Sequence, residues 1–182
     1  MWWPGSVACA TLALSAVFVP MAGGGALASA VNGTLTLAPF NPSKACKFSN
    51  YTLTQPAGPL KVGQKTLVGQ CLATGTFSGV PHSTAAAYGW NWYLAVGANG
   101  KTTGLAEEYG AASLTTASGK LVLLTTGTQQ PVGAQTSLHA KGMTTGTWLL
   151  KGGRGGGSYT YQTERKGSKF TTAVIRLSGS IG

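Results

Sequence analysis

The clearest pattern along the chain is an alternation of apolar and polar residues with a period of two. It is most regular in residues 90–96, Trp-Asn-Trp-Tyr-Leu-Ala-Val, where positions 90, 92, 94 and 96 share one apolar face. Successive side chains of a strand point to opposite faces, so this period predicts a β-strand. Asn99-Gly100 follows, and Asn-Gly is a strong signal of a hairpin turn. We therefore expect a return strand from Thr102 to Tyr109.

The same reasoning predicts a chain built almost entirely of short strands. No stretch has a sustained apolar period of 3.6 residues, so helices should be short connectors at most. Glycine and threonine are abundant, and glycines recur at short intervals, as turns and bulges require. The expected strands are Leu35–Ala38, Tyr51–Thr54, Leu60–Val68, Cys71–Phe77, Trp90–Val96, Thr102–Tyr109, Ser113–Thr116, Lys120–Thr126, Gln135–Ala140, Thr145–Lys151, Ser158–Glu164 and Lys169–Leu177.

This strand pattern predicts an all-β fold. About eight antiparallel strands suit either a single barrel or a two-sheet sandwich. Short turns such as Ser118-Gly119 and Lys166-Gly167-Ser168 join successive strands, which favours an up-and-down barrel over the sandwich. We expect the barrel in residues 60–182 and a loop-rich, proline-rich arm in residues 31–59.

Residues 1–30 have the pattern of a secretory signal peptide. Residues 7–21 are almost wholly apolar, and Ala28-Ser29-Ala30 has the small-x-small pattern of a signal-peptidase site. Prolines interrupt the apolar run, which favours a signal over a transmembrane helix. The residues before the run include no Lys or Arg, which is unusual for a signal peptide. We predict an extracellular protein that begins at Val31 and has no transmembrane segment.

The cysteines fit an extracellular location. Cys9 lies in the predicted signal, which leaves Cys46 and Cys71 as a pair. Two cysteines in an oxidising compartment predict a disulfide. The alternative is a catalytic thiol that acts with His82 or His139.

The charge balance excludes several kinds of chemistry. The chain has 13 Lys+Arg against 3 Asp+Glu, a net charge of +10, and no aspartate. It therefore lacks the parts of a Ser-His-Asp triad, of a carboxylate-rich metal site and of a Cys/His zinc cluster, and it has no phosphate-binding P-loop. We expect no metal and no cofactor. A basic surface favours anionic partners such as acidic polysaccharide, whereas secretion argues against nucleic acid.

The two adjacent glutamates are the main candidates for acid–base chemistry. Glu107 and Glu108 point to opposite faces of their strand, so a paired-carboxylate glycosidase site is not expected. Glu107 is in phase with Leu105 and Tyr109, which resemble a packed face. We therefore expect Glu107 to point inward as a lone acid or base whose pKa is raised by burial. The alternative is that both glutamates are solvated and offset the basic surface.

The remaining candidate residues are a histidine and a group of aromatic side chains. His139 lies on an expected strand and is the candidate acid–base partner of Glu107. If the aromatic residues face inward, they line a core or an apolar pocket. If they face outward, adjacent indoles form a stacking platform of the kind that carbohydrate-binding surfaces use. The candidate ligand-binding residues are Trp90, Trp92, Tyr109 and Trp148.

Residues 146–159, Gly-Thr-Trp-Leu-Leu-Lys-Gly-Gly-Arg-Gly-Gly-Gly-Ser-Tyr, carry a family resemblance. They resemble the stretch in allene oxide cyclase-like and dirigent-like barrels where an apolar strand leads into a GGTG-type turn and then an aromatic residue. The preceding order is also similar: a strand with Gly104 and Glu107, a hairpin, then Lys120–Thr126. The resemblance covers the second half of the chain.

The resemblance implies a secreted eight-stranded barrel with an apolar lumen. Members of these families close a ring in a reactive precursor or steer a coupling, without metal or organic cofactor. They use carboxylates in the lumen, and dirigents rely on aspartates. This chain has only glutamates for that role, and Arg154 and Gly156 replace two residues of the expected turn.

Three functions are compatible with these observations. The first is a cofactor-free barrel that binds a small apolar molecule and guides its cyclisation or isomerisation, which mainly requires holding a reactive conformer. The second is a non-catalytic basic protein that binds glycan or an anionic cell-surface polymer. The third is a structural or defensive protein with no enclosed site. The direction in which Trp90 and Trp92 point separates the first function from the second. A filled, dry barrel interior would count against the first function. An oligomer is compatible with any of the three.

Overall fold

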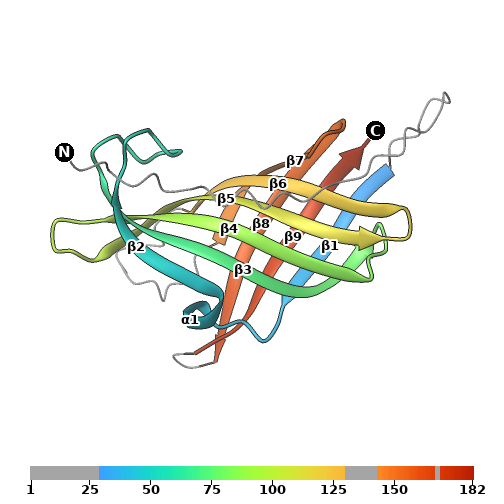
Figure 1. Cartoon of the computed structure of the whole chain (residues 1–182), viewed down its shortest axis with the longest axis horizontal. Helices are drawn as coiled ribbons and strands as arrows, with labels where there is room; N and C mark the ends of the chain where they lie inside the picture. The colour runs from blue at the N-terminus through green and yellow to red at the C-terminus, as the bar shows by residue number, and fades with distance from the viewer. Residues whose placement is uncertain (1–28, 130–142, 167–168) are drawn as a thin grey trace, which may run out of the picture.

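The computed structural model describes residues 29–129, 143–166 and 169–182, and these residues are almost all in strands (Figure 1). Eight strands form a closed antiparallel barrel and a ninth pairs outside the ring, which confirms the all-β prediction. The elements are β1 Ser29–Leu37, α1 Pro42–Ala45, β2 Cys46–Thr52, β3 Lys65–Val80, β4 Ala85–Val96, β5 Thr102–Thr116, β6 Gly119–Gln129, β7 Met143–Leu150, β8 Gly155–Lys166 and β9 Lys169–Ile181.

The ring is an up-and-down meander, as expected. Each strand from β3 to β9 pairs antiparallel with the next strand along the chain. β1 then pairs with β9 on one side and with β3 on the other, which closes the barrel. The hairpins expected at Asn99-Gly100 and at Ser118-Gly119 join β4 to β5 and β5 to β6. Within the described residues, no helix is long and apolar enough to cross a membrane.

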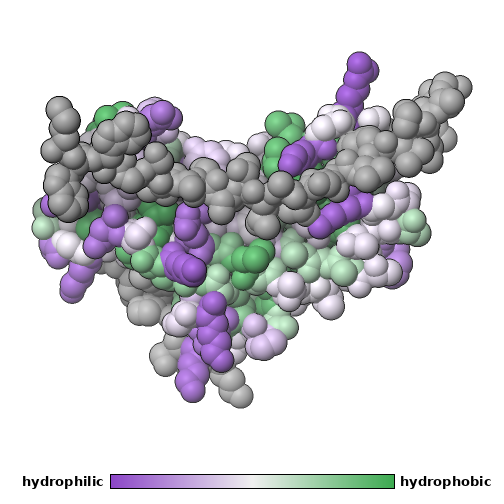
Figure 2. Space-filling view, viewed as in Figure 1, coloured by the Kyte–Doolittle hydropathy of each residue, from purple (hydrophilic) through white to green (hydrophobic). Residues whose placement is uncertain are grey.

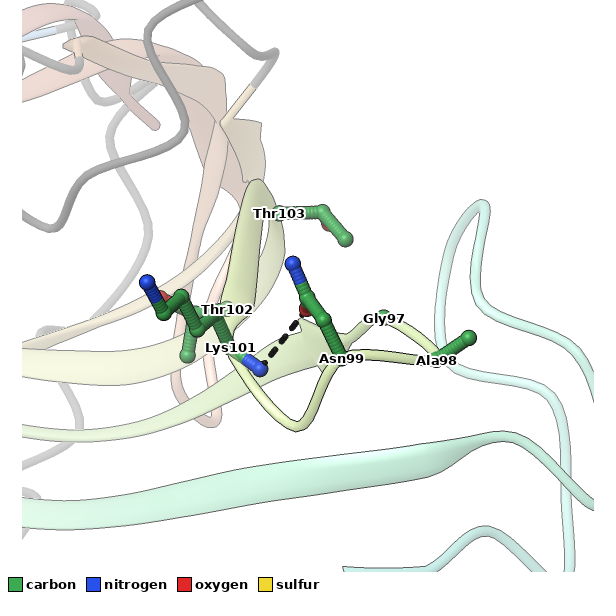
Figure 3. Close-up of a pocket in the computed structure, with 6 residues that line it drawn as sticks. All are labelled: Gly97, Ala98, Asn99, Lys101, Thr102 and Thr103. Atoms are coloured by element: carbon green, nitrogen blue, oxygen red, sulfur yellow. Dashed lines mark hydrogen bonds between the residues drawn. The ribbon is translucent and has the colours of Figure 1, made fainter.

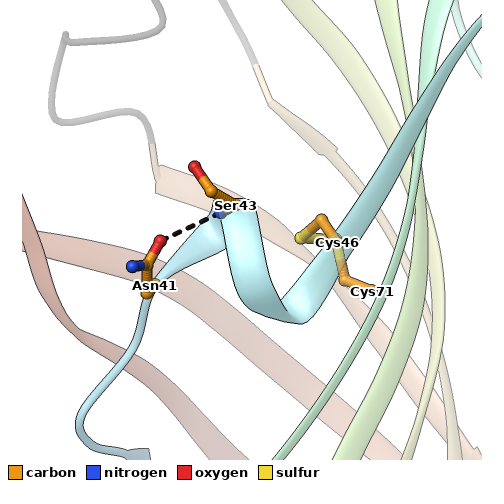
Figure 4. The surroundings of a disulfide bond; sticks show 4 residues. All are labelled: Asn41, Ser43, Cys46 and Cys71. Carbon is orange, nitrogen blue, oxygen red and sulfur yellow. Dashed lines mark hydrogen bonds between the residues drawn. A yellow bond between two sulfur atoms is a disulfide. The ribbon is translucent and has the colours of Figure 1, made fainter.

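β2 is the strand outside the ring, and it shares an edge of β3 with β1. Residues 76–80 of β3 pair with β1, and residues 65–71 pair with β2. Cys46 and Cys71 face each other in the β2–β3 pairing and form the predicted disulfide (Figure 4). The single turn of α1 leads into β2, and the Asn41 side chain accepts a hydrogen bond from the Ser43 backbone at 3.0 Å. An Asn cap of this kind satisfies one of the free N–H groups at the helix start.

The strands are longer than the sequence pattern predicts. Residues expected in two strands, 60–68 and 71–77, mostly form the single strand β3, and 102–109 and 113–116 form β5. The expected interruptions contain Gly69 and Gly110. Gly110 instead lies inside the barrel, where an added Cβ would lie 2.8 Å from the Tyr88 hydroxyl. The glycine makes room for an aromatic side chain rather than turning the chain.

Two further expectations concern the ends of elements. Residues 31–37, expected in the arm, belong to β1 and are part of the ring. The expected strand Gln135–Ala140 lies outside the described residues, as do residues 1–28 of the predicted signal peptide.

The barrel interior is filled by aromatic and aliphatic side chains, and interior glycines make room for them. An added Cβ at Gly127 would clash with the hydroxyl of Tyr159, and one at Gly157 would lie 2.7 Å from the indole nitrogen of Trp148. Alternation of large and small residues is typical of the interior of small barrels. The interior side chains form one continuous core that draws on every strand of the ring.

A second, smaller core lies outside the ring. The connection between β2 and β3, residues 53–64, packs on the outer face of β4 and β5 through Leu53, Ala57 and Leu60. We call this connection the outer arm. It covers Ala95 and the neighbouring outer residues, so part of the outer face of the barrel is buried.

Candidate functional site inside the barrel

A single carboxyl group, that of Glu108, lies in the middle of the apolar interior. Glu108 is on β5 and is 0% exposed. The hydroxyl of Tyr88 donates to Glu108 Oε1 at 2.5 Å, and the hydroxyl of Tyr159 donates to the same oxygen at 3.3 Å. The Tyr88 hydroxyl also lies 2.8 Å from Thr125 Oγ1. Side chains from β4, β6 and β8 therefore converge on one acid from β5.

The strand register explains why these groups meet. Glu108 lies opposite Trp92 on β4 and opposite Gly127 on β6. Gly127 has no side chain, so the Tyr159 hydroxyl can approach the carboxylate across that position. The site depends on contacts between residues far apart in the chain, held by the pairing of the strands.

Burial controls the protonation of this group. Burial raises the pKa of Glu108 to about 7, the bonds from Tyr88 and Tyr159 oppose that rise, and the nearby Glu107 charge adds to it. Burial and then the charge of Glu108 raise the pKa of both Tyr88 and Tyr159 above the usual tyrosine value. The tyrosines therefore remain donors at neutral pH, while Glu108 exchanges its proton there.

Several buried polar atoms around this carboxyl have no hydrogen-bond partner among the described residues. They are Glu108 Oε2, Trp90 Nε1, Trp92 Nε1, Thr144 Oγ1 and the hydroxyl of Tyr161.

These atoms belong to side chains that meet inside the ring. The Tyr161 ring lies 5.4 Å from that of Trp92 and 5.7 Å from that of Trp90, measured between centroids. Thr144 lies opposite Tyr161 in the β7–β8 pairing. β4 and β8 are four strands apart in a ring of eight, so these side chains extend from opposite walls and meet.

Unpartnered polar atoms in an apolar interior have a chemical consequence. Leaving one buried group unsatisfied costs about 1–3 kcal/mol, and such groups are rare in folded proteins. Water or a small bound molecule is the partner that such an interior can accept. The arrangement combines three kinds of group: N–H donors, hydroxyls and a carboxyl oxygen that is free to take a proton.

Glu107, the acid expected to face inward, faces outward, and that prediction was wrong. Its carboxylate is 3% exposed and accepts a hydrogen bond from Thr128 Oγ1 at 2.6 Å. Gly58 of the outer arm lies against it, leaving no room for a Cβ. Burial raises the pKa of Glu107, and the Thr128 bond partly opposes that rise. Both glutamates are buried, so the alternative of two solvated acids is also wrong.

The error came from the choice of strand phase. Leu105 and Tyr109 were taken as the packed face, but Tyr109 is 38% exposed on the outer side, where its ring meets Tyr93 edge-on. The inner face instead carries Ala106, Gly110 and Ala112 with Glu108, because the large aromatic residues of β4 fill the space opposite them. The run of small residues in phase with Glu108 was the signal that could have identified it.

The other candidate residues have different outcomes. Trp90 is buried and Trp92 partly buried in the interior core, so their shared face points inward, and these two residues form no outward stacking platform. Trp148 also lies inside, but its indole N–H donates to the Ser178 carbonyl at 3.2 Å. His139 lies outside the described residues. Among the described residues no group of three or more His, Cys, Asp or Glu could hold a metal ion.

A pocket lies at the tip of the β4–β5 hairpin, separate from these residues. It has a volume of about 300 Å³ and is lined by Gly97, Ala98, Asn99, Lys101, Thr102 and Thr103 (Figure 3). Asn99 is engaged in its own hairpin, where its side chain accepts a hydrogen bond from the Lys101 backbone at 3.0 Å. This pocket is lined by no acid, and its reactive side chains are the Lys101 amine and two threonine hydroxyls, so the interior of the barrel, which holds an acid, is the stronger candidate site.

Comparison of the chain with protein-family models, with curated proteins and with solved structures found no match. The resemblance to allene oxide cyclase-like and dirigent-like barrels therefore stays a prediction.

Proposed function

We propose that the protein is a secreted barrel that binds a small, mainly apolar molecule in its interior and transfers a proton to or from it through Glu108. The observation that carries this proposal is the set of unpartnered polar atoms that lie around the Tyr161 ring. One of these atoms belongs to an acid whose pKa is about 7. A buried acid with such a pKa is suited to general acid–base catalysis at neutral pH.

The aromatic walls determine what kind of molecule would fit. Tyr88, Trp90 and Tyr161 stack or tilt against one another, with centroid distances from 5.1 to 6.3 Å. A ligand between such walls is mainly apolar, because the walls offer few polar contacts besides the unpartnered atoms. The side chains already touch across the ring, and this filled interior counts against a large lumen, so the ligand is small and side chains must move to admit it. Cyclisation or isomerisation of such a molecule requires orientation and proton transfer, and neither requires a cofactor.

The alternative of binding an anionic cell-surface polymer depends on the net charge of +10. Its proposed platform of two outward indoles is absent, because Trp90 and Trp92 belong to the interior core. On the face shown in Figure 2, hydrophilic side chains stand in several separate groups with weakly apolar surface between them. The interior site is therefore the better-supported function.

Native mass spectrometry of protein purified from its own host tests the proposal. We expect a small molecule to co-purify with the wild-type protein and to be lost when the protein is denatured. Tyr161→Phe removes one unpartnered hydroxyl and should reduce the bound fraction, whereas Tyr109→Phe changes an outer tyrosine and should not. If the folded wild-type protein carries no molecule and takes up none from a host extract, the proposal is wrong.

A further inference from the structure

We infer that the ligand is a small carbonyl compound and that the reaction is proton transfer at a carbon next to that carbonyl. Glu108 is the base, and the indole N–H groups of Trp90 and Trp92 are the donors to the carbonyl oxygen. This inference depends on the proposed function, because it names the ligand class and the reaction of the same interior site.

The donors point to an oxygen acceptor. An indole N–H can donate a hydrogen bond but cannot accept one. Trp90 and Trp92 are two residues apart on β4, so both lie on the inner face, and both indole nitrogens lack a partner among the described residues. A hydrocarbon would leave both N–H groups unsatisfied, and a cation would be repelled by them. A carbonyl oxygen has two lone pairs and can accept from two donors.

The base is on the neighbouring strand. Glu108 lies opposite Trp92 in the β4–β5 pairing, so the carboxyl and the indoles are on adjacent parts of one wall. Both tyrosine donors bind Oε1, and Oε2 has no partner in the described part of the chain. The oxygen that can accept a proton is therefore the one that the network leaves free.

The groups facing Glu108 favour a functional base. From β4 and β8 it meets the hydroxyls of Tyr88 and Tyr159, and Glu107 is the charged neighbour on its own strand. Thr125 on β6 holds the Tyr88 hydroxyl. Among the buried residues of the described chain there is no Lys, Arg or His, so no cation in that interior would neutralise the carboxylate.

The reaction balances without any added reactant. Glu108 Oε2 takes the proton from the carbon beside the carbonyl, and the C–H electron pair forms a C=C bond as the carbonyl oxygen becomes an enolate. The two indole N–H groups stabilise the negative charge that develops on that oxygen. Glu108 then returns the proton to the same carbon or to another carbon of the conjugated system. The second outcome is an isomerisation, and neither outcome consumes an oxidant or a cofactor.

Hydrogen exchange of a simple ketone measures this step directly. Cyclohexanone in D₂O exchanges its α-protons for deuterium only through the enol or enolate, and proton NMR follows the loss of signal. We expect the wild-type protein to accelerate the exchange above buffer, and Glu108→Gln to reduce that acceleration by about 10²-fold or more. Glu107→Gln is the matched variant on the other side of the strand; it changes only the pKa of the base, so it should keep most of the acceleration. Equal loss in both variants, or no acceleration by the wild type, would overturn the inference.

A second measurement separates this inference from the proposed function and checks folding. In ¹H–¹⁵N spectra, cyclohexanone should shift the indole signals of Trp90 and Trp92, while Trp148, whose N–H is bonded to Ser178, should not move. Methylenecyclohexane has the same shape without the oxygen and is the control ligand.

If both probes perturb interior side chains but neither shifts the two indole N–H signals, the barrel binds small molecules and the carbonyl assignment is wrong. If neither probe perturbs the interior, the carbonyl assignment is wrong as well, and the native mass spectrum decides the proposed function separately. An unchanged Trp148 signal in Glu108→Gln shows that this variant is folded.

Discussion

Adjacent glutamates on one strand have different environments in this barrel. Glu108 is held by two tyrosine hydroxyls in the interior, and Glu107 is held by Thr128 beneath the outer arm. Burial raises the pKa of both acids above the ordinary glutamate value, and for Glu108 the pKa reaches about 7. Although Glu107 and Glu108 are adjacent in the sequence, only the carboxyl group of Glu108 lies in the barrel interior.

The raised pKa of Glu108 predicts a pH-dependent stability. Its folded-state pKa is about 7 against 4.5 for the ordinary value, so the folded state binds more protons between those pH values. The contribution of Glu108 to the free energy of unfolding should therefore be fully present below about pH 4.5 and be lost as the pH rises through about 7. Glu108→Gln removes this titration, so urea unfolding should show a smaller loss of stability between pH 5 and pH 8. The exposed-acid variant Glu164→Gln should keep the wild-type loss, and an unchanged slope in Glu108→Gln would contradict the assignment.

The charge of Glu107 is expected to act through the strand. It contributes to the raised pKa of Glu108, although burial is the larger cause. Glu107→Gln should therefore lower the pKa of Glu108 while the interior network remains intact. Carboxyl ¹³C NMR titration measures this shift. A Glu108 pKa that rises in this variant would show that the two acids are not coupled as described.

The elements of the barrel fit together by size as well as by pairing. Interior glycines make room for aromatic side chains of nearby strands, so the strands continue through these glycines without a turn. The outer glycine Gly89 has more room: an added Cβ there would lie 3.5 Å from the nearest atom, on Leu72. Gly89 should therefore accept a methyl group that Gly110 cannot.

Alanine substitutions test this difference. Gly110→Ala places a methyl group 2.8 Å from both the Tyr88 hydroxyl and Thr125 Oγ1 and 3.0 Å from a backbone oxygen of Gly89, so these groups must move. We expect a destabilisation of about 1–3 kcal/mol, as overpacked interiors show. Gly89 lies on the outer face of β4, next to Trp90, the residue paired with Gly110. Gly89→Ala should therefore change stability by less than about 0.5 kcal/mol. Chemical denaturation compares them, and equal effects would contradict the interior assignment of Gly110.

The disulfide stabilises the strand that the ring does not hold. β2 pairs with β3 alone, and the Cys46–Cys71 bridge closes a sequence separation of 25 residues. Replacing both cysteines by serine should cost about 3 kcal/mol, since loops of this length contribute roughly that amount. Thermal unfolding with and without reductant measures the loss. Hydrogen exchange should increase first in β2, and an increase that begins in β4 or β5 would contradict this view of the fold.

At the scale of the whole molecule, sequence patterns predicted the architecture better than the site. The hairpin turns and the meander depend on local signals, namely Asn-Gly and period-two alternation. The disulfide follows from the number of cysteines after the predicted signal, which is two. One of the two tyrosine partners of Glu108, Tyr159, is 51 positions away, and only the curved sheet brings the two together. The sequence of one strand also does not show which of its two faces points into the barrel until the neighbouring strands are known. For that reason Glu107 was assigned to the inner face.

The secreted form should begin at Val31. Ser29 and Ala30 belong to β1 and pair with Ile181 and Ser180, but both are exposed, so their removal would leave the buried Val31 as the first ring residue. N-terminal sequencing of extracellular protein tests the cleavage position. Finding Met1 on that material would contradict the prediction.

The closure of the ring has a consequence for how the molecule is made. Among the described strands of the ring, β1 is synthesised before its partner β9 and before all the strands between them, and its other contact, with β3, spans only five paired positions. The ends of the chain must therefore meet before the barrel is complete, and such non-local pairing is slow. A chain that cannot close until its final strand has emerged remains open throughout synthesis. That is the state in which a polypeptide can be threaded through a membrane channel before it folds.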